Sequence, residues 1–491
     1  MKLNIITGKL TKIETEAIVL FVHENEKLFD DLNIIDKKLN GIISGVFKKG
    51  YFSGKEGQIY PIHTYGNISA EKVVLVGLGK KEKFNQEKLR IAVAKTVKFL
   101  RDSSIKNVTI VLLEKTEGIL EDLATMSQIS LYEFKYHKTK DKSQKEIQRL
   151  NFYLFDIKNL KSYQSVLKKS LSIADSINWT RDIINHPSNF ITPKQLTVIA
   201  KKLSSENLNV KAFGEKELKK MGMGLILGVS KGSDEEAQLI QLDYKPKNYK
   251  ETLVLVGKGM TFDSGGISLK PSKSMNEMKM DMAGAGVVLG IMKLLKEIKP
   301  KIRVIGLVPA AENMPSGKAI KPSDILISAS GQTVEIDDTD AEGRLILADA
   351  LFYAQSFKPT AIIDLATLTG ATLIALGSEA SSLLGNNQKL VEKIKISAGK
   401  SGEKVWQLPL WDEYRELIKS DVADINNTGK TRDAGVITAA AFLENFVGNY
   451  PWAHLDIAGT AMTDKPKAYN QKGATGYGIR LIADLIENWS I

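Results

Sequence analysis

Four acidic and three basic side chains have the types and the spacing for metal chemistry. A buried-looking run, Leu253–Val256, leads to Lys258 and Asp263. Ligand sites in open α/β sheets lie beyond the carboxyl ends of strands, so both side chains stand where chemistry is expected. Lys270 follows, and then Asp281 directly before a glycine- and alanine-rich helix start.

The second stretch is DDTDAEGR at residues 337–344, directly before the apolar helix pattern LILADALFYA. Its carboxylates could be capping groups favoured by the helix dipole. A cluster this dense repels itself, so we prefer a divalent cation as its partner. Asp263, Asp281, Asp340 and Glu342 would bring four negative charges together, which two divalent ions would neutralise. Bridging carboxylates hold two such ions about 3.5–4 Å apart in two-metal hydrolases.

The basic side chains add a second argument. A lysine that binds a metal must be uncharged, and two nearby dications lower its pKa by repulsion, so Lys258 is the candidate. Lys270 and Arg344 would stay cationic and suit stabilising an oxyanion or holding an anion. The alternative is that all three are ordinary salt-bridge partners of the same acids.

Composition limits which metal site is available. The chain has no cysteine, and no two of its five histidines are close in sequence. Disulfides, cysteine zinc sites, thiol nucleophiles and HExxH helices are therefore excluded. Oxygen ligands must carry a catalytic metal, and such a ligand set suits zinc, manganese or magnesium.

With these residues the chain resembles the leucyl aminopeptidase family, also called the cytosol aminopeptidase family, of two-metal exopeptidases. DTDAEGRL is similar to the family signature NTDAEGRL except at Asp338, which adds a negative charge and could alter metal affinity. VGKGMTFDSGGISLKP resembles the first metal-binding segment of the family. Shorter agreements such as NHPSNFITP, DLATLTGAT and HLDIAG follow the family's order between Trp179 and Ile482.

The resemblance implies a metal-dependent aminopeptidase that removes N-terminal residues, preferably leucine and other apolar ones, from peptides by attack of a metal-activated water. It implies two divalent ions, Zn or Mn with Mg as a further candidate. It assigns their ligands to Lys258, Asp263, Asp281, Asp340 and Glu342. By the same resemblance, Asp263 and Glu342 of this chain would bridge the two ions.

The same resemblance implies the remaining site residues. Lys270 and Arg344 match the catalytic positions, with a bicarbonate held at the arginine. Met278, Thr367 and Gly370 match positions that line the pocket for the substrate side chain. Family members assemble as hexamers, so a homohexamer is implied as well.

The elements that position these residues indicate two α/β domains: residues 1–160 as a smaller N-terminal domain and residues 161–491 as a larger catalytic domain with a mixed central sheet. The apolar patterns predict strands at 17–22, 73–76, 108–113, 253–256, 303–308, 361–364 and 454–457, and helices at 86–100, 162–184, 284–296 and 344–355. The charged stretch 135–149 predicts an exposed connection.

Two alternative functions remain open. Gly228–Gly232 matches a nucleophile elbow around Ser230, but a polar turn follows it, so a glycine-rich turn between strands is preferred to a serine hydrolase. A formal charge of +11 permits an additional DNA-binding role, which some bacterial relatives have. The lysines are widely spread, so a solvated surface is preferred.

The location of the protein follows from what the sequence lacks. The first residues show no signal-peptide pattern, and no run of about 18 apolar residues occurs. We therefore expect a cytoplasmic protein with peptide substrates and no membrane partner.

Overall fold

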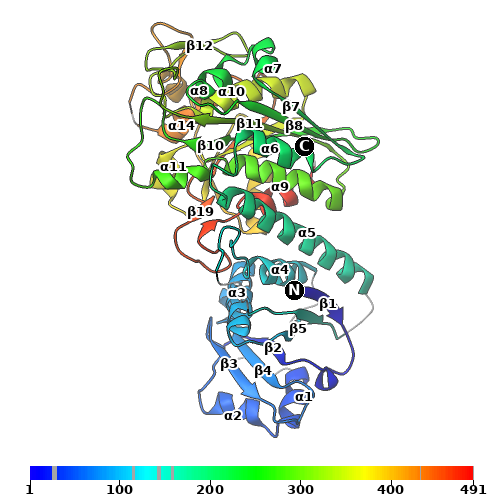
Figure 1. Ribbon diagram of the computed structural model, residues 1–491. Helices are drawn as coiled ribbons and strands as arrows, with labels where there is room; N and C mark the ends of the chain where they lie inside the picture. The colour runs from blue at the N-terminus through cyan, green and yellow to red at the C-terminus, as the bar shows by residue number, and fades with distance from the viewer. Residues whose placement is uncertain (25–29, 113–116, 141–144, 156–159, 432, 490–491) are drawn as a thin grey trace. The chain divides into compact units, whose positions relative to one another are not determined.

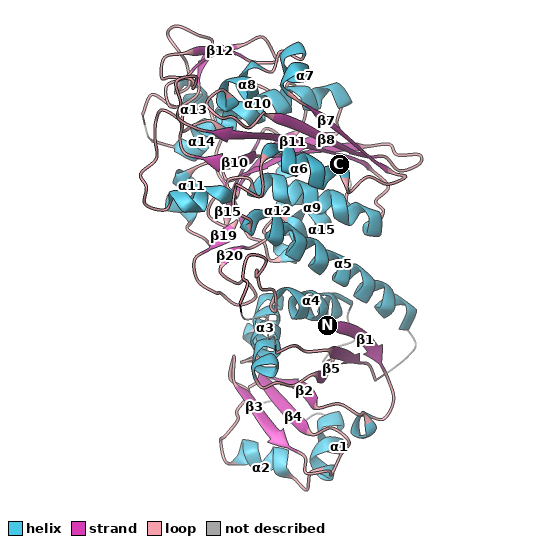
Figure 2. Cartoon of the chain, in the orientation of Figure 1, coloured by secondary structure: helices cyan, strands magenta, loops and turns pink. Residues whose placement is uncertain are grey.

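The computed structural model describes residues 1–24, 30–112, 117–140, 145–155, 160–431 and 433–489 (Figures 1 and 2). The chain forms two compact units: a first unit of Met1–Asp175 with Pro466–Gln471, and a second unit of Ser176–Lys465 with Lys472–Ile491. The units divide within helix α5 (Leu160–Asn185), whereas the boundary predicted from the sequence lies at residue 160, where that helix begins.

The first unit is built on a sheet with helices on both faces. Its described strands are β1 (Lys2–Ile6), β2 (Ala17–Val22), β3 (Ile59–His63), β4 (Lys72–Gly77), β5 (Asn107–Val111) and β6 (Arg149–Tyr153), and its helices are α1 (Asp30–Lys38), α2 (Ile42–Lys48), α3 (Gln86–Asp102) and α4 (Glu117–Ile129). The strand order is β1-β6-β5-β2-β4-β3, parallel except for β3 against β4.

The strand β2 shows why this sheet is covered twice. All six of its residues are buried, as expected for an inner parallel strand with helices on both sides. Its Ile18 and Leu20 pack with Ile35 of α1 and Ile43 of α2, while α3 and α4 lie on the other face (Figure 1). The distant segment Pro466–Gln471 also belongs to this unit.

Most of the predicted elements of the first unit are confirmed. The strands at 17–22 and 73–76 and the helix at 86–100 correspond to β2, β4 and α3. The strand at 108–113 corresponds to β5, although residue 113 lies outside the described residues. The charged stretch 135–149 is mostly exposed, and its residues 141–144 are not described.

The second unit is built on a larger, mixed sheet. Its strands run in the order β16-β15-β18-β14-β9-β11-β8-β7, with β10 also paired to β11. Their bounds are β7 (Leu208–Phe213), β8 (Gln238–Tyr244), β9 (Thr252–Gly257), β10 (Gly259–Asp263), β11 (Arg303–Asn313), β14 (Ala361–Ala366), β15 (Ser381–Gly385), β16 (Val405–Gln407) and β18 (Trp452–Asp456). The two α/β units, of which the larger has a mixed sheet, confirm the predicted fold class.

Helices and short strands complete the second unit. The helices are α6 (Pro193–Lys201), α7 (Glu215–Lys220), α8 (Gly224–Ser230), α9 (Ala283–Ile298), α10 (Gly343–Ala354), α11 (Gly370–Leu376), α12 (Gln388–Ser401), α13 (Asp412–Glu416), α14 (Gly435–Glu444) and α15 (Ile479–Glu487). The short strands are β12 (Ile325–Ile327), β13 (Thr333–Glu335), β17 (Ile425–Asn426), β19 (Met462–Thr463) and β20 (Gly473–Ala474). In the part of the chain that the structure describes, no helix has the length and apolar character to cross a membrane.

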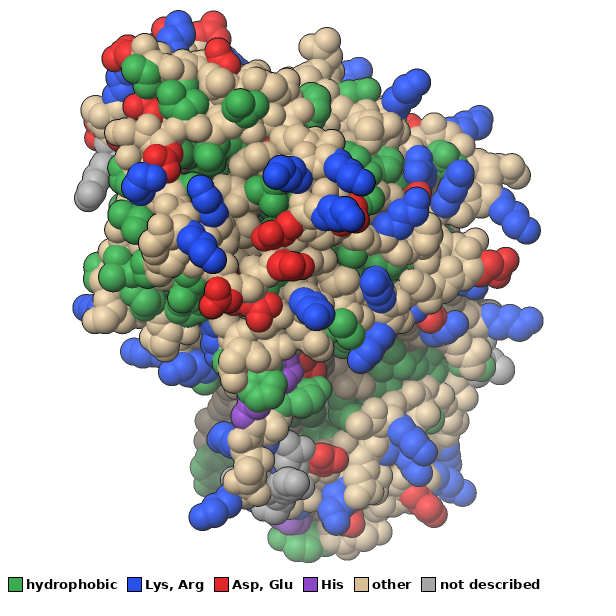
Figure 3. Space-filling model, turned by 45° about the horizontal axis from the view of Figure 1, so that its top comes forward, with side chains coloured by type: hydrophobic (Ala, Val, Ile, Leu, Met, Phe, Trp, Pro, Cys, Tyr) green, Lys and Arg blue, Asp and Glu red, His purple; other side chains and the backbone are tan. Residues whose placement is uncertain are grey.

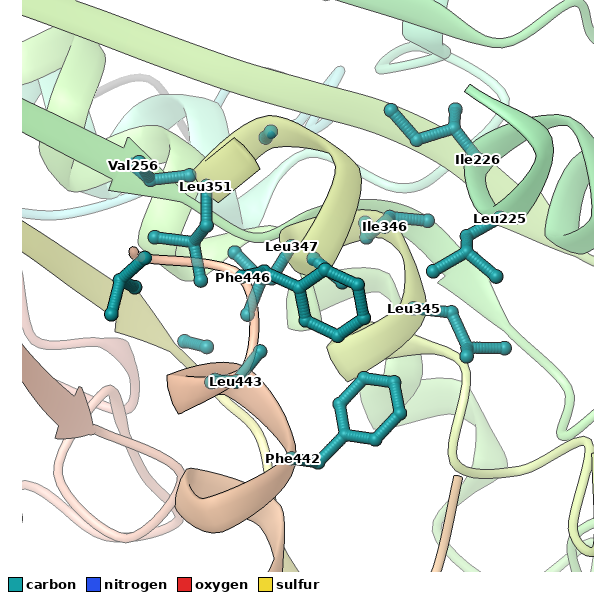
Figure 4. Packing of buried hydrophobic residues seen from close by; sticks show 14 of the residues in the cluster. Leu225, Ile226, Val256, Leu345, Ile346, Leu347, Leu351, Phe442, Leu443 and Phe446 are labelled. Carbon is teal, nitrogen blue, oxygen red and sulfur yellow. The ribbon is translucent and has the colours of Figure 1, made fainter. Parts of the chain in front are cut away.

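One face of the large sheet packs on a buried helical layer. Val254 and Val256 of β9 pack with residues of α8, α10 and α14 in one apolar cluster. Figure 4 shows Leu347 of α10 close to Leu443 of α14 and to Phe446, which follows that helix. Helix α9 packs on β9, β11 and β14 and lies on the opposite face (Figure 1). Burial of this apolar surface is the main force that holds both layers to the sheet.

The sheet topology gathers the polar residues of interest at one edge. Strands β9, β11, β14 and β18 run parallel, so their carboxyl ends share that edge. Lys258 follows β9, Asp263 ends β10 and Thr367 follows β14. Helices α9 and α10 begin there too, directly after Asp281–Met282 and Glu342. The sequence predicts the candidate metal ligands at this carboxyl edge of the sheet.

The prediction of a glycine-rich turn between strands at Gly228–Gly232 is only partly right, because helix α8 continues to Ser230 and the turn begins at Lys231. Gly224 and Gly228 lie inside the helix and serve close packing. A Cβ on Gly224 would lie 2.1 Å from the carbonyl oxygen of Ile327, and one on Gly228 would lie 2.5 Å from Leu326 Cδ1. Glycine therefore lets α8 approach β12.

We predict that Leu347→Ala lowers the free energy of unfolding of the second unit by about 2–5 kcal/mol, because it leaves a cavity in a fully buried cluster. All five tryptophans lie beyond residue 175, so urea denaturation followed by tryptophan fluorescence reports on this unit. Ile396→Ala is the control, since that side chain on α12 is 58% exposed. Equal effects of the two variants would contradict the assignment of the core.

Candidate metal centre

Three carboxylates from two distant stretches of the chain converge at the carboxyl edge of the large sheet. One oxygen each from Asp263, Asp340 and Glu342 lie within 4.8 Å of one another. Asp263 ends β10, and the other two lie in the loop that leads into α10. Asp263 and Glu342 are buried, and Asp340 is half-buried.

Lys258 joins a fourth carboxylate, that of Asp281, to this group, and Lys270 bridges two of the first three. The Nζ of Lys258 lies 2.7 Å from an oxygen of Asp281 and 2.9 Å from one of Glu342. The Nζ of Lys270 lies 2.8 Å from an oxygen of Asp263 and also contacts Asp340. The structure therefore brings together Lys270 and all five residues predicted to bind metal.

The backbone around Lys258 explains how its side chain reaches the acids. Lys258 lies between β9 and β10, its N–H donates to the carbonyl of Leu365, and its carbonyl accepts from the N–H of Ala285 at the start of α9. A Cβ on Gly343 would lie 2.4 Å from Lys258 Cε, and one on Gly284 would lie 2.0 Å from the carbonyl oxygen of Leu365. Glycine at the first turns of α9 and α10 therefore allows both helices to approach the lysine.

The acids hold more negative charge than this buried site favours. Burial, together with the negative charge of the nearby Asp263, raises the pKa of Glu342 to about 8. Burial also raises the pKa of Asp281 to about 6, against the opposing effect of Lys258. For Lys258 and Lys270, burial favours a lower pKa, but the surrounding carboxylates raise it above the ordinary value. Additional positive charge would therefore stabilise the cluster in its ionised form.

The residues present fit divalent cations. Asp281 Oδ2, Asp340 Oδ1 and Glu342 Oε1 are buried and accept no hydrogen bond of normal geometry, although each lies against a lysine ammonium. Buried polar atoms are normally paired, so three such oxygens in one site call for another partner. Carboxylate oxygens are the preferred ligands of hard divalent ions.

Arg344 lies at the start of α10 in a different environment. Its Nη1 donates to the carbonyl of Asn427 over 2.8 Å, and its buried Nε has no hydrogen-bond partner. Burial lowers the pKa of Arg344 to about 10, and Glu342 opposes this effect. A buried guanidinium with a free N–H beside an acidic cluster is able to hold a small anion.

The three predicted pocket residues differ in how they relate to the acids. Thr367 donates its hydroxyl to Asp281 over 2.7 Å, and its carbonyl accepts from Lys258 over 3.0 Å. Met278 is half-buried on the 3-10 helix Met275–Met280, and its carbonyl accepts the N–H of Asp281. Gly370 begins α11, and a Cβ there would meet nothing within 4 Å. Thr367 is thus part of the acidic site, and Gly370 borders open space.

Sequence reasoning missed Asn427, which organises the acidic loop. Its side chain is fully buried. Its Oδ1 accepts the N–H groups of Asp337 (2.8 Å) and Asp338 (3.3 Å), its Nδ2 donates to the carbonyl of Asp338 (2.7 Å), and its carbonyl binds Arg344. Asp338 in turn accepts the N–H of Asp340 over 2.9 Å. Asn427 is almost 90 residues from the loop, so no local pattern signals it.

Asn313 was missed for the same reason, and Thr339 was missed although it lies inside the acidic segment 337–344. Asn313 Nδ2 donates to Asp263 Oδ1 over 2.9 Å and to the carbonyl of Thr339 over 3.0 Å. The hydroxyl of Thr339 accepts the N–H of Ser268 and donates to the carbonyl of Gly265. These bonds join the loop that carries Lys270 to the loop that carries Asp340.

The structure does not place Ser230 in a nucleophile elbow. An elbow follows a strand and precedes a helix, whereas Ser230 ends helix α8. Its hydroxyl donates to the carbonyl of Leu227 over 3.2 Å and to Glu215 over 3.5 Å. His454, the histidine that follows it in sequence, is bonded to Asp364 over 2.6 Å.

The fold and the site define a protein of two α/β units with a candidate centre for divalent metals at the carboxyl edge of a mixed sheet. Residues 178–483 match the family model described as the catalytic domain of the cytosol aminopeptidase family, and residues 19–141 match its N-terminal domain. The chain belongs to the cytosol aminopeptidase family. It is accordingly a metal-dependent aminopeptidase, and the family depends on a pair of divalent metals.

Similar proteins extend over almost the whole chain. Probable cytosol aminopeptidases of a Geobacter species and of Alkaliphilus oremlandii are 44% and 41% identical, with 99% of each chain covered. A mutant of tomato leucine aminopeptidase has a TM-score of 0.88 and 31% identity, covering 99% of this chain and 96% of that one. The bottromycin maturation enzyme BotP in complex with Mn has a TM-score of 0.85 and 27% identity, covering 96% of this chain and 99% of that one.

We predict that Asn427→Ala lowers kcat/KM for an aminoacyl p-nitroanilide by about 10- to 100-fold, because loss of a group that orients metal ligands has effects of this size. Steady-state kinetics at saturating Mn²⁺ measure the change. Asn209→Ala on the exposed surface of β7 is the control. An Asn427→Ala variant as active as the control would refute the orienting role.

Proposed function

We propose that the converged side chains form a dinuclear site that removes N-terminal residues, preferably leucine and other apolar ones, from peptides. Lys258, Asp263, Asp281, Asp340 and Glu342 would hold the metals, with Asp263 and Glu342 between the two ions. The observation that carries this proposal is the group of buried carboxylate oxygens from Asp263, Asp340 and Glu342 within 4.8 Å of one another. We further propose residues 161–491 as the catalytic domain.

The metals supply the charge that the acids need. When bound, two divalent ions lower the pKa of a water and polarise a carbonyl. We propose Zn²⁺ or Mn²⁺, with Mg²⁺ as a further candidate; Mn is present in the BotP complex, a structural neighbour. Lys258 would serve as a ligand in its uncharged form, because nearby dications oppose the carboxylates that raise its pKa.

Two cationic residues complete the catalytic set. Lys270 is partly exposed, unlike Lys258, and its ammonium can therefore face a substrate. We assign it to stabilisation of the negative charge that develops on the substrate carbonyl oxygen. Arg344, with its unpaired Nε, would hold a small anion such as bicarbonate that accepts the proton from the attacking water.

The pocket for the first side chain is proposed at Met278, Thr367 and Gly370. The half-buried methionine offers an apolar wall, and the open space at Gly370 leaves room for a branched side chain. An apolar pocket of this kind favours leucine over smaller residues by burying more of its surface. This is the basis of the proposed substrate preference.

The assembly and location are proposed from the family. We propose a cytoplasmic homohexamer, which sedimentation would test, since a monomer would contradict it. The comparisons give no support to the DNA-binding or serine hydrolase alternatives. On the face in Figure 3, basic side chains are scattered among acidic ones, which agrees with a solvated surface.

We predict that a chelator abolishes hydrolysis of leucine p-nitroanilide and that Zn²⁺ or Mn²⁺ restores it, because the acidic site supplies metal ligands. Glu342→Ala should remain inactive after metal is added, since Glu342 is a central ligand. The measurement is initial rate together with metal content of the purified protein.

Ser230→Ala is the control for this experiment, because a serine hydrolase would lose activity with it. We expect wild-type rates from Ser230→Ala. Chelated protein that is as active as metal-loaded protein would overturn the proposed metal chemistry.

We predict that Lys270→Met lowers kcat by about 10²- to 10³-fold, the effect of removing one group that stabilises an oxyanion. The KM for leucine p-nitroanilide should change much less, because the lysine acts mainly on the developing charge. Lys273→Met, an exposed lysine on the same loop, is the control. A change in KM alone would argue against this role.

A further inference from the structure

A fully buried carboxylate, Asp456, lies at the carboxyl end of β18 and is not among the predicted site residues. Its Oδ1 accepts the N–H groups of Leu368 and Ala458, both over 3.1 Å, and its Oδ2 accepts the hydroxyl of Thr369 over 2.7 Å. Burial of a carboxylate is costly unless it is fully bonded. Through these bonds the two oxygens join the loop at Leu368–Thr369 to the turn at Ala458 that follows β18.

The loop that Asp456 holds carries site residues at both ends. Thr367, directly before Leu368, contacts Asp281 through its hydroxyl and Lys258 through its carbonyl. Gly370, directly after Thr369, begins α11 next to open space. The position of this loop therefore decides both how Lys258 and Asp281 are oriented and how wide the proposed pocket is.

Asp456 ends a row of buried polar side chains on one face of β18. His454 lies two residues earlier on the same face of β18, is fully buried, and is bonded through Nδ1 to Asp364 on the paired strand β14. The indole N–H of Trp452 donates to the other oxygen of Asp364 over 2.8 Å. Burial raises the pKa of Asp456, and the nearby His454 opposes this effect. The carboxylate therefore lies beside a buried, hydrogen-bonded polar group at the centre of the sheet.

We propose that Asp456 is a positioning residue that sets substrate discrimination, by fixing the segment Thr367–Gly370 against Lys258 and Asp281. This inference rests on the proposed function of that site. Asp456 acts through the loop and does not touch the five proposed metal ligands. Its loss would therefore change which side chain is accepted as well as the overall rate.

The test compares Asp456→Ala with Asp456→Asn in metal-loaded enzyme. Asparagine retains the oxygen that accepts from Leu368 and Ala458, and its amide can donate to the hydroxyl of Thr369, whereas alanine removes all three bonds. Steady-state kinetics with leucine and alanine p-nitroanilides give the ratio of the two kcat/KM values. We expect this ratio to fall at least fivefold in Asp456→Ala and to stay within twofold of wild type in Asp456→Asn.

Asp36→Ala is the matched control. Asp36 is also buried, and it accepts the N–H groups of Ile43 and Ser44 and the hydroxyl of Ser44 in the first unit. Its loss should destabilise the protein without changing the leucine-to-alanine ratio. If Asp456→Ala is insoluble, Thr369→Val removes one of the three bonds, and the ratio should shift in the same direction.

Failure of the proposed function and failure of the positioning role give different results. A wild-type enzyme that hydrolyses neither substrate with Zn²⁺ or Mn²⁺ would overturn the proposed function itself. An active wild type, with both rates reduced by the same factor in Asp456→Ala or in Thr369→Val, would leave that function standing and overturn the positioning role. Metal content of the variants, measured after gel filtration, should be lower in Asp456→Ala than in Asp456→Asn.

Discussion

Repulsion among buried carboxylates is the constraint on which the catalytic edge depends. Asp263, Asp281 and Glu342 lie out of solvent within reach of one another, and no fold would keep them so without compensating cations. Lys258 and Lys270 provide part of that charge, and the amino-terminal ends of α9 and α10 add partial positive charge at the same place. In the proposed function divalent metals supply the rest, so the same repulsion that makes the cluster unfavourable on its own would favour metal binding.

The sequence predicts this cluster well because its signal is local. Acids and lysines stand directly after apolar runs that form inner strands, and a parallel sheet brings such positions to one edge. Lys258 is predicted in this way after β9, and Glu342 is predicted from the apolar helix pattern that follows it; the structure joins the two over 2.9 Å. The sequence also predicts strand β2 and helix α10 correctly, because their apolar patterns are typical of a buried strand and a buried helix.

The remaining site residues have no such signal. Asn427, Asn313 and Asp456 act through hydrogen bonds to main-chain atoms far away in the sequence, and their own neighbours show no pattern that marks this role. Gly228 was misread for a related reason: glycine serves both turns and close packing, and only the side chain of Leu326 against α8 shows which applies. Bonds between distant segments are decided by the folded topology.

The membership of Pro466–Gln471 in the first unit has a practical consequence for dissecting this protein. The hydroxyl of Tyr469 donates to Glu87 on α3 over 3.0 Å, and the side chain of Gln471 donates to the carbonyl of Ser130 over 2.9 Å. No single cut of the polypeptide therefore yields both halves intact. A recombinant fragment that starts at Ser176 would retain these residues without the surface they pack on, and Met1–Asp175 expressed alone would lack them.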